Sequence, residues 1–207
     1  MSHCAAKSAA LKSVTFKLAA LKSVALGALL VVGTNTAALA HPGHAGGVAA
    51  GLAHPFTGLD HMLAMVAVGL WAAQLGRPAV WLLPAVFPLT MAVGAALGMS
   101  GVAMPWVEIA ILASVVVLGA AVAFGLRLSL VASAAMVGVF AVFHGHAHGA
   151  EIPAAVSPLL YGLGFVAATL ALHGIGVGIG ALTQRPLPMR AAGGAIAAAG
   201  LVLLVTH

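Results

Sequence analysis

Six long apolar segments constrain the fold of this chain more than any other feature. They lie near residues 56–75, 79–99, 107–124, 128–146, 154–182 and 190–206. An α-helix needs about 20 apolar residues to cross the core of a bilayer. Only 5% of the residues are charged, whereas a water-soluble domain has about 25%. The sequence therefore predicts an all-α integral membrane protein with six transmembrane helices.

The first 40 residues have the features of a secretory signal peptide. Four lysines precede or border an apolar stretch at 24–32, and Ala38-Leu39-Ala40 supplies the small residues of a cleavage site. The alternative is an uncleaved first transmembrane helix, but the apolar stretch is short for a span. We predict that residues 1–40 are a cleaved signal peptide and that residues 41–207 form the six-helix transmembrane domain.

Cleavage would also remove every lysine and the single cysteine, Cys4. Four arginines would then face three carboxylates, those of Asp60, Glu108 and Glu151, for a net charge of +1. The mature chain has no basic patch for nucleic acid, and it has no thiol for a disulfide or a thiolate metal site. Any metal site would use histidine, carboxylate, methionine, backbone or water.

The arginines predict the orientation of the helices. Arg77 lies between the first two apolar segments, Arg127 lies between the third and fourth, and Arg185 and Arg190 lie around the joint between the fifth and sixth. Positive residues favour the cytoplasmic side of a membrane. We therefore predict that these three joints are cytoplasmic and that both termini are periplasmic, in a bacterial inner membrane.

Seven histidines fall into two windows, and the second window is residues 143–151. In a helix, His148 lies about 40° around the axis from His144, and Glu151 lies about 20° away on the other side. These three side chains share one face, while His146 points nearly opposite. Imidazole nitrogens with one carboxylate suit a divalent transition metal. The arrangement is conditional, because Gly145 and Gly149 are able to interrupt the helix.

The first window contains a carboxylate about one turn inside the first apolar segment, Asp60. An ionisable group at that depth is costly and indicates function. His61 is its neighbour, and His54 would share the face of His61 if Pro55 did not make it a flanking residue. Alternatively, Asp60 and His61 only pair with neighbouring helices. Met65, one turn below His61, is either a thioether ligand or ordinary apolar packing.

The predicted topology brings the two windows to the same side of the membrane. The first span runs inward and the fourth runs outward, so both windows meet in the outer half. His41 and His44 lie near the predicted mature N-terminus, as metal-capturing groups or as a solvated tail. His173 lies deeper, in the fifth span. It is either a second station for metal or a histidine hydrogen-bonded to nearby backbone.

Both windows resemble the signatures of one family, the HupE/UreJ nickel/cobalt permeases. The first is His54-Pro55-x-x-Gly58-x-Asp60-His61, and the second is Phe143-His144-Gly145-x-Ala147-His148-Gly149-x-Glu151. The resemblance covers essentially the whole chain. It implies that the motif residues implicated in transport are His54, Asp60, His61, His144, His148 and Glu151. It also implies a link to the metal supply of hydrogenase or urease.

These features predict a secondary permease for Ni²⁺ or Co²⁺, not an enzyme, with metal as cargo and no prosthetic group. The chain has no nucleotide-binding motif, so it does not hydrolyse ATP by itself. Two alternatives remain. One is an intramembrane metalloenzyme, although Gly145 stands where the zinc-protease helix has its general-base glutamate. The other is an accessory membrane protein that senses metal. The partners of the permease would be the lipid bilayer and the metal ion, and not nucleic acid.

Overall fold

The described part of the chain is built from helices only, which confirms the all-α prediction. The computed structural model describes residues 44–183 and 185–206, and the predicted signal peptide and His41 lie outside these ranges. No strand occurs within them. The helices, in order, are α2 (His44–Ala53), η1 (His54–Phe56), α3 (Leu59–Leu75), α4 (Ala79–Met99), α5 (Val107–Phe124), α6 (Leu130–Glu151), α7 (Pro158–Thr183) and α8 (Pro186–Thr206).

Five helices, α4 to α8, are long and apolar enough to cross a membrane. The sixth predicted span is different. α3 has 17 residues, and it reaches the required length only together with the preceding segment Gly47–Phe56, from which it is bent by 81°. The described chain therefore has five candidate spans, or six if this bent pair is one broken span. The bend is important because it lies within the first histidine window.

Several helices extend beyond the apolar segments from which their boundaries were predicted. Residues 44–53 form α2, in a region where no helix was predicted. α6 continues through Gly145 and Gly149 to Glu151, so these glycines do not interrupt it. α8 begins at Pro186, four residues before the predicted start. α7 is the exception, because it begins four residues later than the predicted 154, at Pro158.

The glycines of α6 and α4 bring the backbones of these two helices into direct contact. A Cβ atom added to Gly145 would overlap the Met91 carbonyl group, and one added to Gly94 would overlap the carbonyl of Val142. Small residues at four-residue spacing allow such close packing in membranes. α3 and α7 meet in the same way at Gly69 and Gly176.

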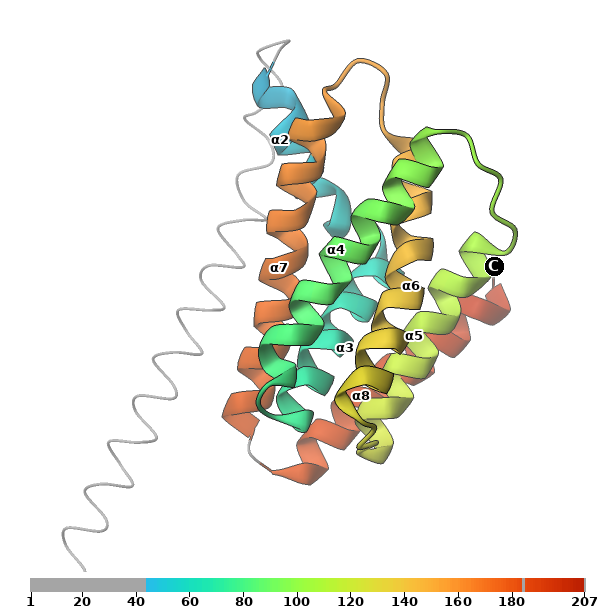
Figure 1. The fold of residues 1–207 in the computed structure, drawn as a ribbon. Coiled ribbons are helices and arrows are strands. Elements are labelled where there is room, and N and C mark those ends of the chain that lie inside the picture. The colour runs from blue at the N-terminus through green and yellow to red at the C-terminus, as the bar shows by residue number, and fades with distance from the viewer. Residues whose placement is uncertain (1–43, 184, 207) are drawn as a thin grey trace, which may run out of the picture. The chain divides into compact units, whose positions relative to one another are not determined.

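Figure 1 shows the helices as an up-and-down bundle in which the turns after α3, α5 and α7 lie at one end. Three of the four arginines gather there, because Arg127, Arg185 and Arg190 line one depression of about 580 Å³ together with Gln74. α2, η1 and the end of α6 lie at the other end (Figure 1). The two histidine windows are thus far from the arginines, as their spacing along the helices predicted.

Candidate metal-binding site

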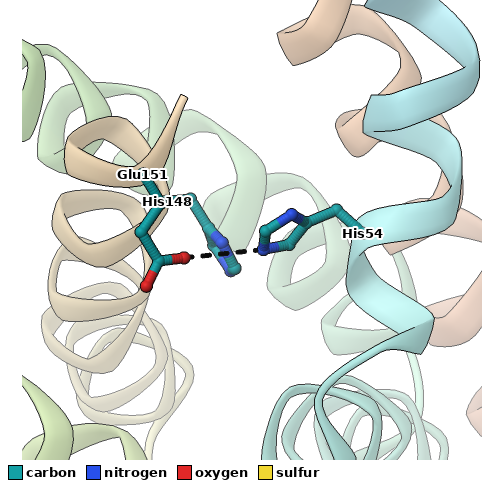
Figure 2. A group of neighbouring side chains, drawn as sticks. All are labelled: His54, His148 and Glu151. Atoms are coloured by element: carbon teal, nitrogen blue, oxygen red, sulfur yellow. Dashed lines mark ion pairs between the residues drawn. The ribbon is translucent and has the colours of Figure 1, made fainter. Parts of the chain in front are cut away.

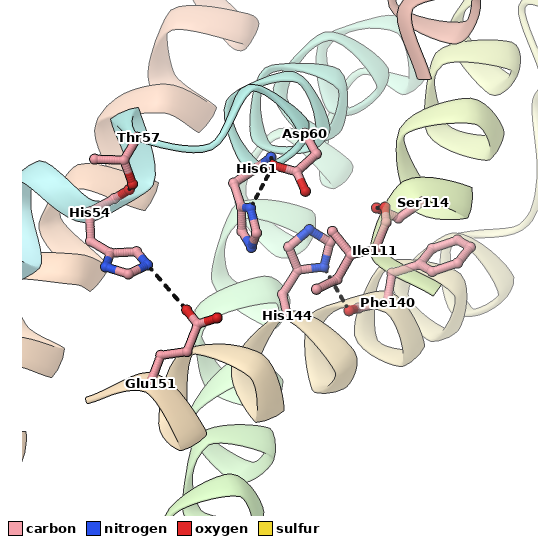
Figure 3. Close-up of polar contacts among 9 residues, drawn as sticks. All are labelled: His54, Thr57, Asp60, His61, Ile111, Ser114, Phe140, His144 and Glu151. Carbon is pink, nitrogen blue, oxygen red and sulfur yellow. Dashed lines mark hydrogen bonds and ion pairs between the residues drawn. The ribbon is translucent and has the colours of Figure 1, made fainter. Parts of the chain in front are cut away.

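The candidate site is assembled from three segments that meet at one end of the bundle. η1 supplies His54, the first turn of α3 supplies Asp60 and His61, and the last two turns of α6 supply the other three residues. Figure 3 shows the side chains from η1 and α3 pointing toward those from α6. Because the backbone bends between η1 and α3, His54 faces α6 from the side instead of continuing the line of α3.

The last turns of α6 contact α4 on one face and η1 and α3 on another. Gly145 and Gly149 lie one turn apart and face the backbone of α4, where a Cβ would overlap Met91 and Ala95. His144 and His148 precede them by one residue each, so they lie about 100° around the helix on the side of η1 and α3. The glycines therefore fix the depth at which the histidines are presented. The predicted common face of His144, His148 and Glu151 is present because the helix is continuous.

An outer group consists of His54, His148 and Glu151. One potential ligand atom from each lies within 4.8 Å of the others, and Nε2 of His54 is 3.6 Å from Oε2 of Glu151. Figure 2 shows the three side chains converging from η1 and α6. Bonds of about 2.1 Å to a tetrahedral ion would place the ligand atoms about 3.4 Å apart. Small side-chain movements would therefore suffice for metal binding.

An inner group consists of Asp60, His61 and His144. Asp60 Oδ1 accepts hydrogen bonds from the backbone N–H of His61, at 2.8 Å, and from its Nδ1, at 2.9 Å. Nδ1 of His144 donates to the carbonyl oxygen of Phe140 at 3.0 Å. Nε2 of both histidines is buried without a hydrogen-bond partner among the described residues. Metal-binding histidines commonly have this arrangement, with one nitrogen anchored and the other available.

The two groups are continuous through His61. Its ring centroid lies 4.4 Å from that of His148 and 4.9 Å from that of His144. Exposure falls along the series, from 56% for the Glu151 side chain and 29% for His54 to 4% for His148 and 0% for His144. All six residues predicted as metal ligands thus lie in one cluster that leads from the surface into the bundle. Their binding of metal stays a prediction.

Two of the residues predicted as additional ligands, Met65 and His173, do not join this cluster. Met65 is fully buried in the apolar core of α3. His173 lies in α7, buried at another position. His44 begins α2, but its side chain lies outside the described part, as does all of His41. His146 points away from the cluster. Its Nε2 donates a hydrogen bond to the carbonyl oxygen of Val102, at 2.7 Å.

Three aromatic residues that sequence reasoning missed surround the histidines. Phe165 lies 4.3 Å from His148 between ring centroids, Tyr161 lies 5.7 Å from His54, and Phe87 lies 5.5 Å from His144. An apolar cleft of about 480 Å³ between α4, α6 and α7 reaches Tyr161, Phe165 and His148. The one available signal was Tyr161, the single tyrosine of the chain, four residues before Phe165 and therefore on the same face of a helix.

Comparison with known proteins identifies one family and one curated relative. The family model described as HupE / UreJ protein matches residues 28–203. Protein HupE of Rhizobium leguminosarum bv. viciae is 49% identical over 170 residues, which cover 80% of this chain and 89% of that protein. No solved structure matches the chain.

Proposed function

Because the chain belongs to the HupE/UreJ family, we propose that it is a secondary permease that carries Ni²⁺ or Co²⁺ from the periplasm into the cytoplasm. The family is one of metal transporters rather than enzymes. The observation that supports the proposal best is the six-residue cluster, in which four imidazoles and two carboxylates converge at one end of an otherwise apolar bundle. The metal carried by the permease would supply a hydrogenase or a urease.

The composition of the cluster suits a cargo that is bound and then released. Imidazole is a borderline ligand and carboxylate is a hard one, a combination that accepts nickel and cobalt. Transport requires binding that is favourable enough for entry but weak enough for exit. Glu151 and His54 are partly exposed, so they would meet the ion first and exchange its water. His148, His61 and His144 would then take the ion inward.

The proposed direction follows from the distribution of charge. The arginines lie at the end of the bundle opposite the cluster, and arginines favour the cytoplasmic side. The cluster would therefore open to the periplasm of a bacterial inner membrane. The orientation also agrees with a cleaved signal peptide, which would leave the mature N-terminus outside.

Uptake of radioactive nickel by intact cells tests the proposal. Cells that carry the protein should accumulate ⁶³Ni²⁺ faster than cells with an empty vector. His144→Ala and Asp60→Asn should abolish the difference, because each removes part of the inner group. His146→Ala is a matched control on the same helix and should keep uptake. Unchanged uptake in both cluster variants, at equal abundance in the membrane, would contradict the proposal. Competition by Co²⁺ in this assay would determine which metal is preferred.

A further inference from the structure

His173, on α7, is buried in a way that packing alone does not explain. It is 0% exposed, and neither ring nitrogen has a hydrogen-bond partner among the described residues. Burying a polar group without a partner costs about 1–3 kcal/mol by protein mutational data. Buried polar side chains in native proteins are nearly always satisfied, so each exception needs a reason. A ligand that binds only during transport would be such a reason.

The depth of His173 follows from the contact between α3 and α7. A Cβ added to Gly69 would overlap the carbonyl oxygen of His173, so the two residues lie at the same level. Gly69 follows His61 by eight residues, which corresponds to about 12 Å along a helix. The apolar core of a bilayer is about 30 Å thick. His173 therefore lies well below the cluster, toward the middle of the membrane.

Phe87 lies between the two levels. Its ring centroid is 5.5 Å from that of His144 and 5.2 Å from that of His173, and both contacts are edge-to-face. Phe87 is itself 0% exposed. One apolar ring thus contacts both the innermost histidine of the cluster and the isolated histidine. A direct path from His144 to His173 runs beside this ring.

Oxygen atoms without partners accompany His173. Thr169 lies one turn before it on α7, is 0% exposed, and its hydroxyl group has no hydrogen-bond partner in the described chain. On α4, Pro88 has no N–H, so the carbonyl of Pro84 lacks its usual helical donor. That carbonyl lies near His173, but neither nitrogen of the ring makes a hydrogen bond with it that meets the usual geometry. One imidazole and neutral oxygens form a weaker set of metal ligands than the cluster.

We propose that His173 and Thr169 form a second, inner binding station for the transported divalent metal, and that Phe87 is the gate between this station and the cluster. The inference rests on the proposed function, because it concerns the same cargo. The inner station has no carboxylate, so it would hold the ion more weakly and release it toward the cytoplasm. The ring of Phe87 must turn aside for each ion, which prevents a continuous open pore.

Uptake into proteoliposomes that contain a metal-quenched dye tests the station and the gate. His173→Ala should leave the half-saturating metal concentration within about twofold and lower the maximal rate at least about tenfold, since the cluster is intact and a ligand is lost. Thr169→Val keeps the side-chain shape and should lower the maximal rate in the same direction. Phe87→Ala should raise it, and Phe87→Trp should lower it. Leu118→Ala, a buried substitution on α5, controls for general loosening of the core.

A binding measurement separates this inference from the transport proposal. In equilibrium dialysis of the purified protein with Co²⁺, His173→Ala should bind one ion fewer per chain than wild type, whether or not the wild type transports. Equal stoichiometry and an equal maximal rate for His173→Ala would overturn the inner station. A Phe87→Ala rate no higher than that of Leu118→Ala would overturn the gate. If wild-type vesicles take up no metal, the proposed function fails, and the dialysis result alone then decides the inner station.

Discussion

Among single residues, the two histidines of the inner group are each held in place by a hydrogen bond from Nδ1. His61 is anchored through Nδ1 to Asp60 and His144 through Nδ1 to the carbonyl of Phe140, and both present Nε2 to the interior. Because a carbonyl or carboxylate oxygen accepts only, each Nδ1 carries a proton, and in the neutral imidazole Nε2 then has the lone pair that a metal needs. Asp60 therefore orients His61 through Oδ1, and its own binding of metal stays a prediction.

Gly58 gives a sharp test of this orientation. A Cβ at Gly58 would lie 2.7 Å from Asp60 Oδ1 and 2.9 Å from His61 Nδ1, so Gly58→Ala should displace the pair while every ligand atom stays in the chain. We expect Co²⁺ affinity, measured by calorimetric titration, to fall about 10-fold or more, as when an outer-shell partner is lost. Gly162→Ala is the matched control, since nothing lies within 4 Å of a Cβ there. Equal affinity in both variants would contradict the orienting role.

At the scale of elements, each functional helix uses one face for packing and another for chemistry. α6 packs Gly145 and Gly149 against α4 and turns its histidines toward α3 and η1. α7 packs Gly176 against α3, while its neighbours Gly174 and Gly178 face open space. Since close helix contact in a membrane depends on small residues, the position of a histidine is set by the glycine beside it.

The glycines of α7 allow a comparison within one helix. Gly176→Ala would place a Cβ against the carbonyl of Val66 on α3, and we expect it to destabilise the protein by about 1–3 kcal/mol, as overpacking does in cores. Gly178→Ala meets no neighbour and should be neutral or stabilising by up to about 1 kcal/mol, because alanine favours helix. Thermal unfolding in detergent measures both. A melting temperature lowered equally by the two changes would show that the close contact is not the cause.

At the scale of the whole molecule, charge is separated between the ends of the bundle. Arg127, Arg185 and Arg190 line one depression. Asp60 and Glu151 lie at the other end, each within 4 Å of a histidine nitrogen. No arginine pairs with a carboxylate among the described residues. In the described part of the chain, the arginines thus remain unpaired with carboxylates at their end of the bundle, and Asp60 and Glu151 belong to the candidate site.

Reporter fusions test the orientation that this separation predicts. Alkaline phosphatase, which is active only outside the cytoplasm, should be inactive when fused after Arg77 or Arg185. It should be active when fused in the turn between α4 and α5 or in the turn between α6 and α7, since these lie at the opposite end of the bundle. Green fluorescent protein should give the reverse pattern. Phosphatase activity at Arg77 would contradict the proposed periplasmic opening, even if metal uptake were normal.

The apolar spans, the helical content and the two windows of candidate ligands could all be predicted from the sequence. Apolar length and 3.6-residue periodicity are local properties, so they could be read from residues in order. They also put His144, His148 and Glu151 on one face. The same reasoning failed at the α2 segment, which is too short and too glycine-rich to predict a helix. It also failed at the end of α6, where tertiary packing outweighs the low helix propensity of glycine, and at the start of α8, where a proline at the first helical position is compatible with a helix.

How the two windows combine could not be predicted from the sequence, because it depends on how the helices pack. The 81° bend before α3 turns His54 toward Glu151, and the glycine contacts between helices set the depths of His144 and His173. Phe87 joined the site through packing alone, and the only sequence signal for Tyr161 was its four-residue spacing from Phe165. Distances between residues far apart in the chain depend on the angles and offsets of packed helices. These angles and offsets result from all the contacts between the helices together, so they cannot be predicted from a local sequence pattern.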